Sequence, residues 1–176
     1  MGRRRTVHFN VLAVLSYERC RAARDQWPET KNSHLPCSPT FCQQSSDLAK
    51  AIEYLYGKGY EVFDVVGIEG GLESHQLGIW GALAEAPGDV GITLHSDRSE
   101  IHRISPKLGE TLVEVPIGSE FSVFALENCN SVTVIGGKWG LNGESLRLST
   151  RGLHNIAEAS TLSFSSDGVL VAIINR

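Results

Sequence analysis

Residues 60–83 constrain the fold most, because they read in succession as a strand, a glycine-containing turn and a helix. The first part is rich in β-branched residues, which favour a strand. The glycines that follow are Gly67, Gly70 and Gly71. Glycine adopts backbone conformations that a β-carbon forbids, so these residues predict a tight turn. Ser74 can then act as the N-cap of a helix.

The predicted helix would place three large apolar side chains on one face: Leu77, Trp80 and Leu83. A glycine turn that leads into a helix N-terminus presents free N–H groups and a partial positive charge, which suits a phosphate group. Its spacing is neither G-x-G-x-x-G nor that of a Walker A loop. Taken alone, the motif therefore favours a turn that only connects a strand to a helix, with a phosphate site as the alternative.

A second helix is predicted directly after Ser46-Asp47, where Leu48, Ile52 and Leu55 recur at helical spacing. Gly57 and Gly59 are expected to end it. A further strand is expected at Gly91–His95. Helices that alternate with strands indicate an α/β layer.

After residue 97 the pattern changes to short segments rich in Val, Ile and Thr and separated by turn residues. Strands are predicted at 100–104, 111–115, 121–126, 131–135, 145–148, 161–165 and 169–174. Such spacing is typical of an antiparallel sandwich. Ser166-Asp167-Gly168 reads as a hairpin turn between the last two strands.

Composition excludes several classes of partner. The net charge of −4 argues against nucleic acid or an anionic membrane as the main partner. No apolar run is long enough to span a bilayer, and we expect a cytoplasmic protein. The four cysteines show no paired C-x-x-C spacing. Cys37 and Cys42 could hold a metal with His34, but free thiols are the simpler interpretation.

Residues 1–45 contain no interpretable site. A strand could occupy 6–15 and a short helix 17–27, and 33–45 reads as irregular loop. The expected organisation is therefore an unmatched segment at 1–45, an α/β nucleotide-binding layer at 46–97 that is incomplete at its N-terminus, and an antiparallel β-sandwich at 98–176.

Several segments, taken in order, resemble thiamine pyrophosphokinases. They are S-D-L-A-K-A-I-E-Y-L from Ser46, V-V-G-I-E-G-G-L-E-S-H from Val65, G-G-K-W-G-L from Gly136, S-T-R-G-L-H-N from Ser149 and G-V-L-V-A-I from Gly168. The resemblance covers about residues 46–176. It implies an ATP-dependent transfer of diphosphate to thiamine with Mg²⁺, by a homodimer that binds thiamine between its subunits.

On the nucleotide side the resemblance is partial. It implies a role for Asp47 in catalysis and as a metal ligand, and for Ser46, Gly70, Gly71 and His75 in binding the nucleotide. The two acids expected before Ser46 are replaced by Cys42 and Gln44. The expected arginine is replaced by Leu72 and the catalytic aspartate by Ser74, beside which Glu73 could substitute.

On the thiamine side the resemblance is closer. It implies substrate-binding roles for Trp139, Arg151, Gly152, Leu153, His154 and Asn155, and only His154 departs from the pattern, where the family has serine. From the residues alone, a place in the core between the sheets is the favoured interpretation of Trp139, and Asn155 could cap a turn. Because diphosphate transfer depends on charge neutralisation, the lost acids predict reduced activity. The alternative is an inactive relative that binds thiamine or partners another subunit.

Overall fold

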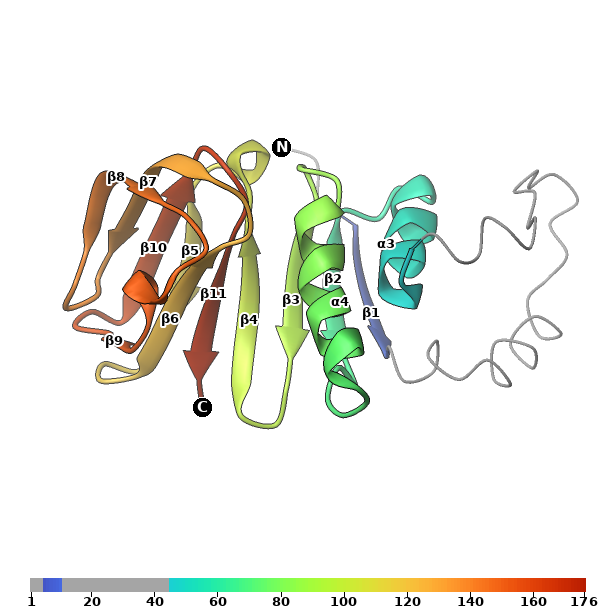
Figure 1. Ribbon diagram of the computed structural model, residues 1–176, viewed down its shortest axis with the longest axis horizontal. Helices are drawn as coiled ribbons and strands as arrows, with labels where there is room; N and C mark the ends of the chain where they lie inside the picture. The colour runs from blue at the N-terminus through green and yellow to red at the C-terminus, as the bar shows by residue number, and fades with distance from the viewer. Residues whose placement is uncertain (1–4, 11–44) are drawn as a thin grey trace, which may run out of the picture.

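The computed structural model describes residues 5–10 and 45–176, which form mostly β-sheet: two sheets and two α-helices (Figure 1). The strand predicted at 6–15 is present in its described part as β1 (Thr6–Asn10). The helix predicted at 17–27, the loop at 33–45 and the possible metal ligands His34, Cys37 and Cys42 lie outside the described residues.

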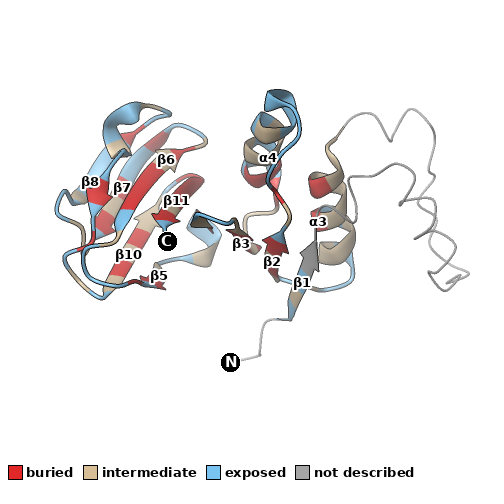
Figure 2. Ribbon diagram, turned by 90° about the horizontal axis from the view of Figure 1, so that it is seen from below, coloured by how far each residue is buried: buried red, intermediate tan, exposed pale blue. Residues whose placement is uncertain are grey.

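The first sheet begins with three parallel strands: β1, β2 (Val62–Val66) and β3 (Gly91–His95). Helix α3 (Asp47–Gly57) lies between β1 and β2 in the chain, and α4 (Glu73–Glu85) lies between β2 and β3. Both helices cover the same face of these strands (Figure 2). Because each helix returns the chain to the start of the next parallel strand, both helices begin at the edge where the strands end.

Helix α3 matches the sequence prediction at both ends. The Ser46 side chain accepts a hydrogen bond from the Ala49 N–H at 3.2 Å, which makes Ser46 the N-cap. Leu48 and Ile52 are buried against the sheet. The N–H of Gly59, a residue with a φ of +82°, bonds to the Tyr56 carbonyl and closes the helix.

Helix α4 differs from the prediction at its start and on its surface. Leu72 occupies the N-cap position without a side-chain hydrogen bond, and Ser74 lies within the first turn, so Ser74 is not the N-cap. Leu83 is buried as predicted, but Leu77 is exposed. The helix buries only part of the apolar face that the sequence suggests, because it packs against a single sheet on one side.

The first sheet continues with antiparallel strands in the order β4 (Ser99–Ile104), β11 (Leu170–Asn175), β6 (Glu120–Ala125) and β9 (Asn155–Ile156). A second sheet contains β5 (Thr111–Glu114), β10 (Thr161–Ser166), β7 (Cys129–Ile135) and β8 (Leu141–Leu146). The short 3₁₀ turns η2 (Pro106–Leu108) and η3 (Thr150–Gly152) lie between strands. Since β3 pairs with β4, one sheet runs through the boundary predicted near residue 97.

Two strand predictions are wrong. The strand expected at 145–148 begins earlier, at Leu141. The last two strands do not form a hairpin, because β10 belongs to the second sheet and β11 to the first. Their connection therefore crosses between the sheets, and the Asp167 carboxylate accepts hydrogen bonds from the N–H groups of Asn130 and Ser131 there.

Two apolar cores follow from this arrangement. One lies between the first sheet and the two helices and includes Phe63, Leu83 and Leu94. The other lies between the two sheets and includes Phe121 and Phe164, whose rings meet edge to face at 6.0 Å. None of the helices in the described residues has the length and apolar character needed to cross a membrane.

Candidate functional site

The first candidate region is the edge where the parallel strands end, because both helix N-termini lie there. Residues 69–75 are all exposed at this edge. Gly70 and Gly71 have φ values of +82° and +81°, so the turn requires glycine as the sequence predicted. Gln76 holds the turn from within α4, since its side-chain amide donates to the carbonyls of Ile68 and Gly70.

The predicted nucleotide-side residues do not assemble into a metal site. Asp47 is paired with Lys50, with 3.4 Å between Oδ1 and Nζ. Glu69 accepts the Asp97 N–H at 2.7 Å and so supports the turn between β3 and β4. No group of three His, Cys, Asp or Glu side chains with metal-binding geometry occurs among the described residues. These residues therefore do not fit a protein-held Mg²⁺ ion.

The remaining predicted residues of this edge are open to solvent. Glu73 and Ser74 belong to the first turn of α4, where backbone N–H groups lack helical partners. The His75 ring lies close to Gly71, since a β-carbon on Gly71 would be 3.5 Å from Nδ1. An anion could bind to this helix end, but Glu69 and Glu73 oppose it electrostatically.

The second candidate region is the tip of the sandwich around Trp139. Its indole is 56% exposed, so the core interpretation of Trp139 is wrong. The Lys138 ammonium lies over the ring at 4.8 Å from its centroid. An exposed aromatic surface beside a flexible cation is able to stack on a planar ligand.

Asn155 fixes the backbone that presents this indole. It is buried, its Oδ1 accepts the Trp139 N–H at 3.1 Å, and its Nδ2 donates to the Trp139 carbonyl at 2.7 Å. Oδ1 also accepts the Ile156 N–H at 2.9 Å. Because its amide is used in these bonds, Asn155 holds the backbone of Trp139 in place from inside the protein.

Glycines permit the close packing behind Trp139. A β-carbon on Gly137 would lie 2.6 Å from the Phe121 ring and 2.9 Å from Nδ2 of Asn155. Gly136 has a φ of +90°, and a β-carbon there would lie 2.6 Å from the Thr161 carbonyl oxygen. Close packing and backbone conformation therefore account for the two glycines of the G-G-K-W segment, whatever role the exposed tryptophan has.

The loop 151–155 lies along the edge of β6. Arg151 is exposed and its guanidinium is paired with the Glu144 carboxylate. Gly152 packs directly on the Val123 carbonyl, and Leu153 is 43% exposed. His154 pairs with Glu120, with 2.9 Å between Nδ1 and Oε1. The structure thus brings Trp139 and Asn155 into contact, whereas among the described residues no hydrogen bond or ion pair joins these two to the helix N-termini.

A row of titratable groups crosses β1 to β4 on the face opposite the helices. His95 Nε2 is 2.9 Å from Asp64 Oδ1, and His8 Nδ1 is 3.1 Å from Oδ2 of the same carboxylate. Glu100 lies 3.7 Å from His95 and from His102. His95 meets Asp64 and His102 meets Thr93 from neighbouring strands, so the sequence shows no ligand spacing around either histidine.

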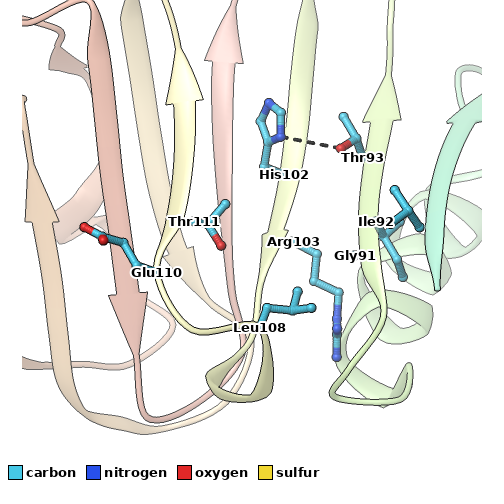
Figure 3. Close-up of a pocket in the computed structure, with 9 residues that line it drawn as sticks. Gly91, Ile92, Thr93, His102, Arg103, Leu108, Glu110 and Thr111 are labelled. Carbon is cyan, nitrogen blue, oxygen red and sulfur yellow. Dashed lines mark hydrogen bonds between the residues drawn. The ribbon is translucent and has the colours of Figure 1, made fainter. Parts of the chain in front are cut away.

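A shallow pocket of about 240 Å³ opens beside this row (Figure 3). His102 and Thr93 line it, with 3.5 Å between Nδ1 and Oγ1. Nε2 of His102 is buried without a hydrogen-bond partner among the residues that the structure describes. None of the residues predicted to bind ATP or thiamine lines the pocket.

Burial lowers the pKa of His102, although Glu100 opposes this shift. Because the folded protein binds this proton less readily than the unfolded chain, the neutral form contributes stability that is lost as the pH falls below about 6.5, the ordinary pKa of histidine. Urea unfolding at several pH values should show this loss. In His102→Gln, the free energy of unfolding should fall less steeply as the pH is lowered. An unchanged slope in the variant would contradict the assignment.

No protein-family model matches the sequence, and no curated protein matches it. Solved structures do match the fold. Thiamine pyrophosphokinase from Bacillus subtilis aligns with a TM-score of 0.65 and 23% identity, over 92% of this chain and 74% of that chain. The enzyme from Geobacillus thermodenitrificans aligns with a TM-score of 0.61 and 21% identity, over 76% of this chain and 63% of that chain.

A thiamin pyrophosphokinase family protein from Enterococcus faecalis gives a TM-score of 0.56 and 18% identity, over 95% of this chain and 78% of that chain. The chain has a thiamine pyrophosphokinase-like fold. The low identities make this a likeness of fold.

Proposed function

We propose that this protein is a thiamine diphosphokinase that transfers diphosphate from ATP to thiamine with reduced activity. The observation that supports this most is the exposed Trp139 platform, fixed by buried Asn155, within a thiamine pyrophosphokinase-like fold. Thiamine combines a planar pyrimidine with a cationic thiazolium, and both suit an aromatic face. ATP would bind at the N-termini of α3 and α4, near Ser46, Gly70, Gly71 and His75.

Mg²⁺ is not assigned to this chain, since Asp47 is paired with Lys50 and the described residues contain no suitable cluster. The chain's own contribution is then to hold thiamine against Trp139 and to present helix N–H groups to the phosphates. The acids Asp47 and Glu73 would act on the reacting groups only in a rearranged site. This predicts slow turnover.

A homodimer in the cytoplasm remains part of the proposal. The resemblance implies that thiamine binds between subunits, and four large apolar side chains of the sandwich are exposed: Trp139, Leu148, Leu153 and Ile156. Arg151 and Gly152 belong to the same loop and would shape the thiamine pocket. Light scattering of the full chain measures the oligomeric state directly.

Thiamine binding without catalysis is the second candidate function. The specific observation that favours it is the absence of a metal-binding cluster among residues 5–10 and 45–176. The two candidates share the Trp139 platform and differ in whether thiamine diphosphate is formed. Binding and turnover must therefore be measured separately.

Trp139→Ala is expected to weaken thiamine binding about tenfold or more, because stacking on an aromatic side chain contributes about 1–3 kcal/mol. Calorimetric titration with thiamine measures this. Leu112→Ala is the matched control, since Leu112 is 62% exposed on the second sheet and far from the tip in sequence. Equal affinity of the Trp139 variant and the wild type would exclude this platform as the thiamine site.

A further inference from the structure

His154 has an unusual backbone conformation. Its φ is +60°, and it is the only non-glycine residue with a positive φ in the part of the chain that the structure describes. Left-handed backbone is unfavourable for a residue with a β-carbon. Contacts with the surrounding residues must therefore hold His154 in this conformation between η3 and β9.

Three contacts supply that constraint. The backbone N–H of His154 donates to Ser122 Oγ at 3.2 Å. The ring Nδ1 lies 2.9 Å from Glu120 Oε1. The same oxygen accepts a hydrogen bond from Asn175 Nδ2 at 3.0 Å, so the carboxylate is itself held in place by a neighbouring strand.

This arrangement sets the chemistry of the ring. A carboxylate opposite Nδ1 favours the tautomer in which Nδ1 carries the proton and donates it to Glu120. Nε2 then has a free lone pair. The His154 side chain is 69% exposed, so a substrate is able to reach Nε2.

We propose that His154 is the general base of the transfer reaction, with Glu120 as its positioning residue. This rests on the proposed function. Nε2 would accept the proton of the thiamine hydroxyl while that oxygen forms a bond to the β-phosphorus of ATP. The bond from the β-phosphorus to the oxygen that it shares with the α-phosphorus breaks, and AMP leaves with the electron pair.

The position of His154 in the chain agrees with this role. It directly precedes Asn155, whose side-chain amide forms hydrogen bonds with both the N–H and the carbonyl of Trp139. The stacking platform and the base are therefore supported by adjacent residues.

His154→Gly is the decisive variant, because glycine adopts left-handed backbone without strain and the fold should be retained. We expect kcat for thiamine diphosphate formation to fall about 10²-fold or more, with KM for thiamine changed less than about threefold. Added imidazole should restore part of the rate. Glu120→Gln should lower kcat and alter the acidic limb of the pH–rate profile.

His8→Asn is the matched control, since His8 is also exposed and also faces a carboxylate, at 3.1 Å, but has ordinary strand backbone. It should keep the wild-type rate. Turnover in His154→Gly equal to the wild type, or a loss that imidazole does not relieve, would overturn the assignment alone. Absence of turnover in the wild type would overturn the proposed function and this inference together.

Discussion

Replacing Arg103 with alanine is expected to destabilise the protein by about 3–5 kcal/mol. Arg103 is 3% exposed, and its guanidinium donates to carbonyls at the end of α4 and in the loop that follows. The distances are 2.6 Å to Leu83, 2.7 Å to Ala86, 2.9 Å to Val90 and 3.3 Å to Pro87. The alanine variant would leave these buried acceptors without their donor.

The positive charge of Arg103 is tolerated in the interior because negative groups lie around it. Burial lowers the pKa of Arg103, while the negative end of the α4 dipole and the carboxylates of Glu127 and Asp89 favour the charged form. Arg103→Lys should recover little, since an ammonium cannot match the planar fork of donors.

Urea unfolding followed by circular dichroism measures the effect. Arg98→Ala is the control, because Arg98 is exposed in the turn between β3 and β4 and such changes usually stay within about 0.5 kcal/mol. A loss below about 1 kcal/mol in Arg103→Ala would contradict the role given to Arg103.

Gly152→Ala is expected to cost about 3 kcal/mol, or to displace the loop 149–155, because a β-carbon at Gly152 would lie 2.0 Å from the Val123 carbonyl oxygen. That oxygen belongs to the backbone of β6 and has little freedom to move. Displacement of the loop would also disturb Asn155 and weaken thiamine binding.

Thermal unfolding and thiamine titration of the same variant test both consequences. Gly78→Ala is the control, since a β-carbon there meets no atom within 4 Å and alanine favours a helix. Wild-type stability and affinity in Gly152→Ala would show that the loop is not held against β6.

Local signals predicted the elements whose stability is decided locally. The Ser46 cap and the spacing of Leu48 and Ile52 defined α3 correctly, since a cap and an amphipathic face are both sequence properties. The strand at Gly91–His95 was also correct. The turn glycines Gly70 and Gly71 were predicted for the same reason.

Features that depend on distant strands were not predictable. Ser166-Asp167-Gly168 has good hairpin chemistry, but turn residues do not specify which sheet the next strand joins. Glu120 reaches His154 from another strand, and Arg103 finds its acceptors at the end of α4, so neither shows a spacing pattern. The role of Asn155 as an internal support was likewise invisible in the sequence.

Formation of thiamine diphosphate and AMP by the full-length chain tests the central claim most directly. The assay supplies thiamine and the magnesium salt of ATP, and chromatography separates the products. The account predicts slow but enzyme-dependent formation of both products in equal amounts, and Trp139→Ala should lower the rate about tenfold or more at subsaturating thiamine. Thiamine binding with no product above a protein-free control would contradict the kinase assignment and leave a thiamine-binding protein.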